Sequence, residues 1–189
     1  MILKIIFIIA LFVLSSCGSS VKYQTDFTSV TVNKKDNPTL KGYYEDKLIQ
    51  IKASHESEML LEIKNKSENK IKIIWDDCLF VDPLGTSHKV ISSNTRYLAR
   101  NESQPPTTIL PETTFQDIIS NVDNIFFEGS PPSWVNLGIL RNGFGPMYDA
   151  KSIAGSYVGK PMKLLIVIEN SDGKKQDYYL NFMVKGYSK

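Results

Sequence analysis

The chain has 189 residues, 42% of them hydrophobic, and its 22 Lys and Arg residues nearly balance its 20 Asp and Glu residues. Because these charges are interspersed and the formal net charge is only +2, the composition gives no indication of a nucleic-acid partner. Nine Tyr and nine Phe residues, together with abundant Ile and Val, favour β-strands.

Residues 1–16 have the three parts of a secretory signal peptide. Lys4 and the amino terminus are positive, residues 5–14 are apolar, and Ser15 and Ser16 are small residues at the processing site. About ten apolar residues form a helix of roughly 15 Å, whereas the hydrocarbon core of a bilayer is about 30 Å thick. We therefore expect a cleaved signal rather than a permanent membrane span.

The end of this segment, Leu14-Ser15-Ser16-Cys17, resembles the lipobox of bacterial lipoproteins. The resemblance implies that Cys17 receives a diacylglyceryl group on its sulfur and becomes an acylated amino terminus after cleavage. Two or more acyl chains hold a protein firmly on a membrane. Residues 18–20 contain no acidic side chain, so the resemblance implies sorting to the outer membrane with the domain facing the periplasm. The inner membrane and the cell surface remain open as alternatives.

The second cysteine, Cys78, has no partner in the chain if Cys17 carries lipid, so we expect a fold without a disulfide. Cys78 lies in the apolar stretch 78–81, which is typical of a small buried hydrophobic residue. The neighbouring Asp76 and Asp77 would raise the pKa of its thiol, the opposite of what a reactive cysteine needs.

Residues 17–26 are small and polar and are expected to form a lipidated tether, followed by one domain over residues 27–189. Patterns of apolar residues predict strands at 27–32, 47–53, 58–64, 70–75, 78–81 and 86–91. A polar turn at 65–69 predicts that the strands on either side of it form a hairpin. Residues 82–85, Asp-Pro-Leu-Gly, predict a tight turn.

The second half of the chain contains longer loops. Residues 92–106 are polar, end in Pro-Pro and are expected to form a loop, followed by short strands at 107–110, 113–119 and 124–127. Residues 128–161 show only a short helix near 149–156, and we expect this segment to pack on the domain because structureless loops of such length are uncommon. Residues 163–169 and 176–184 predict a final hairpin.

Many short strands with closely spaced turns predict an all-β, antiparallel β-sandwich. Residues 59–75 and 109–112 resemble immunoglobulin-like domains of bacterial envelope proteins, which implies an immunoglobulin-like β-sandwich with long loops. Residues 87–126, with Arg96-Tyr97 and Arg100-Asn101 among them, also resemble a group of uncharacterised bacterial lipoproteins, a resemblance that transfers no activity. Immunoglobulin domains pack a Trp against a disulfide. Because that disulfide is absent, Trp75 is expected to pack on aliphatic side chains.

Two groups of residues are candidates for binding. Arg96, Tyr97 and Arg100 lie on loop 92–106, and Arg and Tyr are enriched in binding hot spots, while loops on a rigid scaffold often carry recognition. Trp134 and Tyr148 form a second, aromatic candidate. A structural role remains open for both groups, with Tyr97 covering the edge of the core, the arginines pairing locally, and Trp134 and Tyr148 lining the core.

The sequence supplies no catalytic or metal-binding pattern. His55, in a polar turn, and His88, in a strand, are the only histidines, and no G-x-S-x-G motif or zinc-ligand spacing accompanies them. We therefore expect no cofactor and no metal. The prediction is a non-enzymatic, membrane-anchored envelope lipoprotein that binds another protein or an envelope component. The alternatives are a periplasmic carrier or chaperone for hydrophobic cargo, an enzyme of unrecognised type and a structural spacer.

Overall fold

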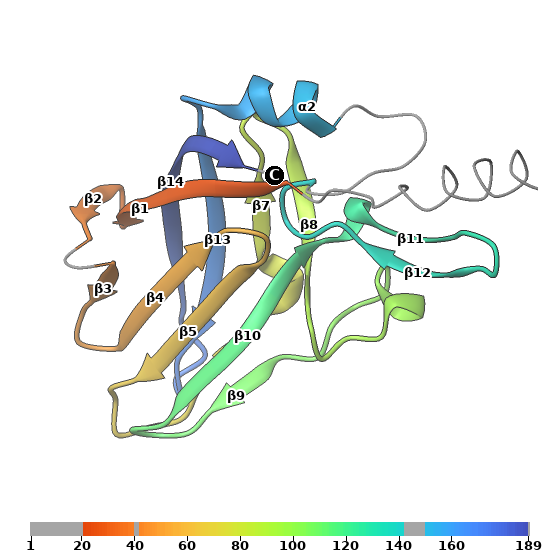
Figure 1. The fold of residues 1–189 in the computed structure, drawn as a ribbon. Helices are drawn as coiled ribbons and strands as arrows, with labels where there is room; N and C mark the ends of the chain where they lie inside the picture. The colour runs from red at the N-terminus through yellow and green to blue at the C-terminus, as the bar shows by residue number, and fades with distance from the viewer. Residues whose placement is uncertain (1–20, 40–41, 142–149, 189) are drawn as a thin grey trace, which may run out of the picture.

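The computed structural model describes residues 21–39, 42–141 and 150–188. Figure 1 shows the strands wrapped around a common interior, with helix α2 (Ala150–Tyr157) across one end and a separate two-stranded hairpin projecting from the side. None of the helices in this described part of the chain is long and apolar enough to cross a membrane.

One antiparallel sheet contains most of the strands, and its neighbours follow the order β2-β1-β14-β13-β7-β8-β10-β5-β4-β3. The strands along this path are β1 (Lys22–Val32), β2 (Lys35–Pro38), β3 (Tyr43–Glu45), β4 (Ile49–His55), β5 (Met59–Asn65), β7 (Leu79–Val81), β8 (Ser87–Ser92), β10 (Thr114–Asn121), β13 (Pro161–Glu169) and β14 (Lys175–Ser188). Two short strands lie off the path: β6 (Ile71–Ile73) pairs with β13 and with β9 (Thr107–Ile109). The projecting hairpin consists of β11 (Ile125–Glu128) and β12 (Ser133–Asn136).

The sheet curls until β1 returns to the end of β4. The Tyr23 amide donates to the Glu56 carbonyl at 2.9 Å, and the Thr25 hydroxyl donates to the His55 carbonyl at 2.8 Å. The prediction of a two-sheet immunoglobulin-like β-sandwich is therefore wrong, because the ten strands form one nearly closed, barrel-like antiparallel sheet. The pairing of β1 with β14 contains two register shifts, and such bulges bend a strand and increase its twist, which favours this closure.

The predicted hairpin around residues 65–69 is also wrong, because β5 pairs with β4 and β10, whereas β6 pairs with β13 and β9. Asn65 holds the connection between them. Its buried side-chain amide donates to the carbonyl oxygens of Asn69 at 2.8 Å and Ile109 at 3.1 Å. The Asn65 side chain thereby bridges the chain to β9, and the polar segment is a crossing rather than a hairpin turn.

Other local predictions are confirmed. The β7–β8 and β13–β14 hairpins form around the expected turns, and α2 lies within one residue of the expected helix. The first strand differs, since β1 begins at Lys22, inside the segment predicted as tether, and is not limited to residues 27–32. Strands β2, β3 and β12 were not expected from the sequence.

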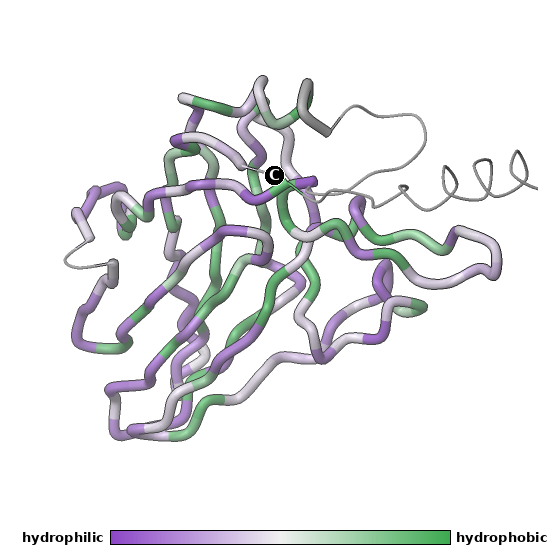
Figure 2. Tube along the Cα trace, in the orientation of Figure 1, coloured by the Kyte–Doolittle hydropathy of each residue, from purple (hydrophilic) through white to green (hydrophobic). Residues whose placement is uncertain are grey.

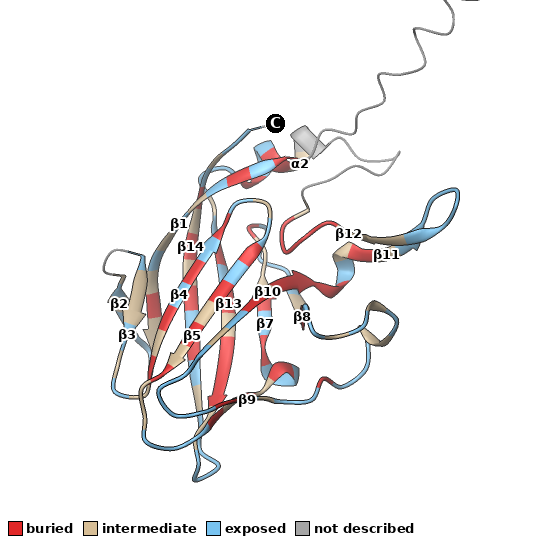
Figure 3. Ribbon diagram, turned by 60° about the horizontal axis from the view of Figure 1, so that its bottom comes forward, coloured by how far each residue is buried: buried red, intermediate tan, exposed pale blue. Residues whose placement is uncertain are grey.

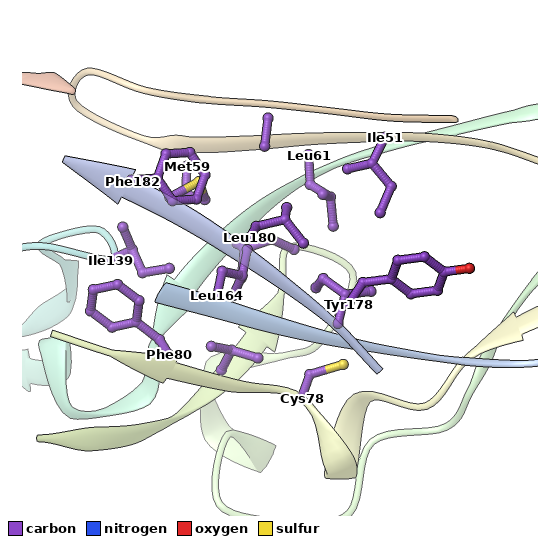
Figure 4. Close-up of a cluster of buried hydrophobic side chains, with 14 of the residues drawn as sticks. Ile51, Met59, Leu61, Cys78, Phe80, Ile139, Leu164, Tyr178, Leu180 and Phe182 are labelled. Atoms are coloured by element: carbon purple, nitrogen blue, oxygen red, sulfur yellow. The ribbon is translucent and has the colours of Figure 1, made fainter. Parts of the chain in front are cut away.

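The interior of the sheet is filled by side chains. Hydropathy alternates along the strands (Figure 2), and the residues that face inward are buried (Figure 3). Ile51, Met59 and Leu61 lie opposite Leu180 and Phe182 from β14 (Figure 4). The largest fully buried side chains are Trp75, Tyr23, Tyr178, Phe80 and Phe182.

Trp75 and Cys78 both lie in this core. The Trp75 ring packs on Phe115, with 6.2 Å between ring centres, and its N–H donates to the Thr107 hydroxyl at 2.8 Å, so the expectation of purely aliphatic packing is wrong. Cys78 is the buried residue that the sequence predicts. Its burial raises the pKa of the thiol to about 12, with a smaller contribution from nearby Asp77.

Candidate functional site

The β11–β12 hairpin is fixed to the sheet at its base and exposed at its tip (Figures 1 and 3). Ile91, Val122 and Ile125 form a small buried cluster at the base, and Tyr97 and Trp134 pack against it. Because side chains alternate along a strand, Ile125 and Phe127 share one face of the hairpin, and Trp134 lies opposite Phe127 on that face.

Loop 92–106 approaches the same face and is held at its start by Asp117 of β10. The nearly buried Asp117 carboxylate accepts hydrogen bonds from the hydroxyls of Ser92 and Ser93, and from the Ser93 amide at 3.2 Å. Hydrogen bonds to an ionised acceptor are stronger than neutral ones. The start of the loop is therefore fixed relative to the sheet.

Gln104 holds the end of the loop. Its buried side chain donates to the Val90 carbonyl at 2.7 Å and accepts from the Ser92 amide at 3.2 Å. The backbone amide of Gln104 donates to the Asp76 carboxylate at 3.0 Å. Hydrogen bonds from the Ser103 hydroxyl and the Gln104 amide lower the pKa of the Asp76 carboxyl, which favours the charged acceptor.

The loop and the hairpin meet at Trp134. The rings of Tyr97 and Trp134 pack edge to face with 6.0 Å between their centres, and the Arg100 guanidinium lies 5.0 Å above the centre of the Trp134 ring. The Asn136 amide donates to the Tyr97 hydroxyl at 3.1 Å. Three residues from two separate sequence predictions are thus brought into contact.

Two exposed apolar side chains that the sequence reasoning did not select complete this area. Leu98 is 82% exposed beside Tyr97, and Phe127 is 57% exposed although its ring lies 5.3 Å from the centre of the Trp134 ring. Phe127 stands two residues after the buried Ile125, so strand alternation could have placed it on the face of Trp134. We call Tyr97, Leu98, Arg100, Phe127 and Trp134 the aromatic surface.

The remaining predicted site residues do not join the aromatic surface. Arg96 is exposed at the start of the 3₁₀ helix η2 (Tyr97–Ala99), and its side chain forms no ion pair or hydrogen bond within the described residues. Arg100 donates to the Tyr97 carbonyl at 3.2 Å and pairs with no carboxylate of the described chain. Tyr148 and Cys17 lie outside the described residues.

A second polar cluster surrounds His88, beside a surface pocket of about 270 Å³. The Nδ1 atom of His88 lies 2.7 Å from an Asp123 oxygen, and its Nε2 atom lies 3.3 Å from an Asp82 oxygen. Both ring nitrogens of His88 therefore face carboxylates of this chain. The cluster ties the β7–β8 turn to the 3₁₀ helix η3 (Val122–Asn124).

His55 is buried rather than part of a polar turn. It ends β4, is 2% exposed and lies with its ring centre 5.7 Å from that of Tyr23. Neither ring nitrogen has a hydrogen-bond partner among the residues that the structure describes, and burial lowers the pKa of the imidazole to about 4. Across the described residues, no group of three or more His, Cys, Asp or Glu side chains is arranged to hold a metal ion.

A groove of about 550 Å³ lies on the outer face of β4, β5 and β10. Leu60 is exposed in it, while Lys52 pairs with Glu62 at 2.7 Å and Gln116 donates to the same carboxylate at 2.6 Å. These hydrogen bonds lower the pKa of the Glu62 carboxyl. The groove is thus a charged surface feature and not a cavity inside the sheet.

Comparison of the chain with protein-family models, with curated proteins and with solved structures finds no match. The fold alone does not define an activity, since one architecture supports many functions.

Proposed function

We propose that the protein is a non-enzymatic binding module of a bacterial envelope, anchored by lipid on Cys17, and that the aromatic surface is where it binds. One observation carries the proposal. Tyr97 and Arg100 converge on Trp134, at 6.0 Å and 5.0 Å, while Leu98 and Phe127 remain exposed beside them.

The composition of this surface matches that of binding hot spots. Trp, Tyr and Arg contribute most of the binding energy in many interfaces. Exposed apolar side chains such as Leu98 and Phe127 gain free energy when a partner covers them, and contiguous groups of this kind mark interaction sites.

The surface is also held in place before binding. Asp117 and Gln104 fix the two ends of loop 92–106, and Asn136 fixes Tyr97. A site that is already ordered loses less conformational entropy when it binds. This feature supports recognition by the loop over a spacer role, in which the loop would need no such fixation.

The anchor follows from the lipobox resemblance of residues 14–17. Lipid on Cys17 would restrict the domain to a thin layer beside the outer membrane, facing the periplasm, and so raise its effective concentration toward components held there. A partner needs only modest intrinsic affinity under these conditions.

The alternatives receive less support. A carrier of hydrophobic cargo needs space inside the sheet, but large side chains such as Trp75, Tyr178 and Phe182 occupy the interior. An enzyme needs a nucleophile or base in reach of a substrate. Beside the His88 pocket, the Ser156 hydroxyl donates to the Ile153 carbonyl at 2.7 Å, and both His88 nitrogens face carboxylates.

Site-specific photo-crosslinking in intact cells tests the proposal. A photoreactive amino acid at position 98 or 127 is expected to form adducts with an envelope component. The same amino acid at Leu110, an exposed residue after β9, serves as the matched control and is expected to form none. Absence of adducts at positions 98 and 127, or equal yields at all three positions, would contradict the proposal.

A further inference from the structure

We propose that the component bound by the aromatic surface is the phospholipid surface of the same membrane that holds Cys17. This inference rests on the proposed anchoring of the chain. The aromatic surface would then be a second point of attachment, and the two points together would set the orientation of the domain on the membrane.

The length of chain between the anchor and the domain supports this. Val21 follows Cys17 by four residues and is buried in the core, so its position is fixed in the domain. An extended chain spans at most about 3.6 Å per residue, which keeps the Cys17 Cα within roughly 14 Å of the Val21 Cα. The membrane must therefore pass close to the start of β1.

The start of β1 lies at the base of the β11–β12 hairpin. The Tyr23 hydroxyl donates to the Arg141 carbonyl at 2.8 Å, and the Arg141 guanidinium lies 6.0 Å from the centre of the Phe126 ring in β11. Figures 1 and 3 show the start of β1, α2 and the base of the hairpin at one end of the sheet. A membrane beside Val21 is consequently also beside the hairpin.

The side chains of the aromatic surface suit a membrane interface. Trp and Tyr rings favour the level of the lipid headgroups, and Leu and Phe insert into the adjoining acyl region. Arg100 pairs with no carboxylate in the described part of the chain and would bind a phosphate group, as would Arg96, which lies outside the aromatic surface but directly precedes Tyr97. Glu128 follows Phe127 in β11, and strand alternation directs it to the other face of the hairpin.

Further exposed apolar side chains surround the same end of the sheet. Leu84 lies beside the pocket that α2 helps to form, Val158 follows α2, and Tyr187 pairs with Tyr23. These residues belong to separate elements and do not form one compact patch with Phe127. Such a distribution favours a broad, planar partner over a protein that fits one pocket.

Fluorescence quenching by brominated lipid tests this inference, because the chain has only two Trp residues. The mature lipoprotein is reconstituted into vesicles of phosphatidylethanolamine and phosphatidylglycerol, with bromine near the headgroup end of the acyl chains. Trp134 is expected to be quenched, whereas the core residue Trp75 is not. The Trp134→Phe variant, which leaves only Trp75, should therefore lose the quenching.

Replacing Leu98 and Phe127 together by Asp should abolish the quenching, whereas the same substitution at Leu110, on another part of the surface, should leave it unchanged. Emission from Trp75 reports whether each variant is folded.

Vesicle flotation distinguishes failure of membrane docking from failure of the lipid anchor. Floating protein with unquenched Trp134 overturns membrane docking and leaves the anchor intact, and failure to float overturns both. A protein adduct in place of a lipid adduct from position 98 also overturns membrane docking.

Discussion

Arg100 lies over the ring of Trp134, with its guanidinium carbon 5.0 Å from the ring centre. The two residues belong to a loop and to a hairpin that do not pair as strands. Their contact joins the two segments into one surface. The Tyr97 ring adds a second contact between the loop and the hairpin, because it packs edge to face on Trp134. The order of this surface therefore depends on a few side-chain contacts that mutations can remove individually.

The contribution of the Arg100–Trp134 contact can be measured with Arg100→Met, which keeps much of the side-chain volume but removes the charge. We expect a loss of about 0.5–1 kcal/mol in the free energy of unfolding, the usual value of a cation–π contact at a partly exposed site. Urea denaturation measures the loss. Arg96→Met is the control and should leave stability unchanged, since Arg96 has no such contact in the described residues. Equal effects of the two substitutions would show that the contact contributes nothing.

Removal of the Asp117 carboxylate should loosen loop 92–106. Asp117→Ala leaves the Ser92 and Ser93 hydroxyls and the Ser93 amide without their acceptor, at an expected cost of about 2–3 kcal/mol. Hydrogen exchange should become faster in residues 92–106 and remain unchanged in β13. Uniform acceleration across the sheet would instead indicate general destabilisation and would contradict a local role for Asp117.

Burial of His55 predicts acid sensitivity. The folded protein holds the imidazole neutral, with a pKa of about 4, while an unfolded chain protonates it below about pH 6.5. Between these values the unfolded state binds more protons, so stability should fall as the pH falls from about 6.5 to 4. The contribution is at most about 1.4 kcal/mol per pH unit and roughly 3 kcal/mol in total.

The measurement is urea denaturation at several pH values for the wild type and for His55→Phe. In the variant, the free energy of unfolding should fall less steeply as the pH is lowered, because the contribution of His55 is missing. This difference is expected whatever the absolute stability of the variant. Carboxylates such as Asp76, whose pKa is lowered in the fold, contribute their own acid sensitivity at lower pH in both proteins. Identical slopes between pH 6.5 and 4 would mean that His55 is not held neutral in the core.

The buried Cys78 thiol should be inert in the folded protein. Its pKa of about 12 leaves almost no thiolate at neutral pH, and the side chain has no access to solvent. A disulfide reagent added to a Cys17→Ser variant should react only after denaturant is added. Rapid labelling without denaturant would show that β7 opens readily from the sheet.

Local pattern predicted many of the strands and their buried faces, but not the fold that they form. The alternation of Ile49, Ile51 and Ala53, and of Met59, Leu61 and Ile63, correctly identified which residues face the core. Alternation of apolar and polar residues indicates which face of a strand is buried, but not which strand pairs with it. This is why β5 and β6 were wrongly predicted to pair with each other and the closure of the sheet was not predicted.

The candidate site was predicted by residue type and not by geometry. Tyr97, Arg100 and Trp134 were selected because such side chains are common in binding sites. Their mutual contact was not predicted, and neither were Asp117 and Gln104, which hold the two ends of the loop. The prediction that His55 lies in a polar turn was wrong, because its polar neighbours conceal that it ends a strand and is buried. The buried hydrogen bonds that fix the loop join residues far apart in the chain.

Lipid attachment at Cys17 can be measured by mass spectrometry of the intact protein from membranes of its native cells. We expect a chain that begins at Cys17 and carries the mass of a diacylglyceryl group and a further acyl chain. A chain that retains residues 1–16 without lipid, or a product released into the medium, would contradict membrane anchoring and, with it, the proposed function.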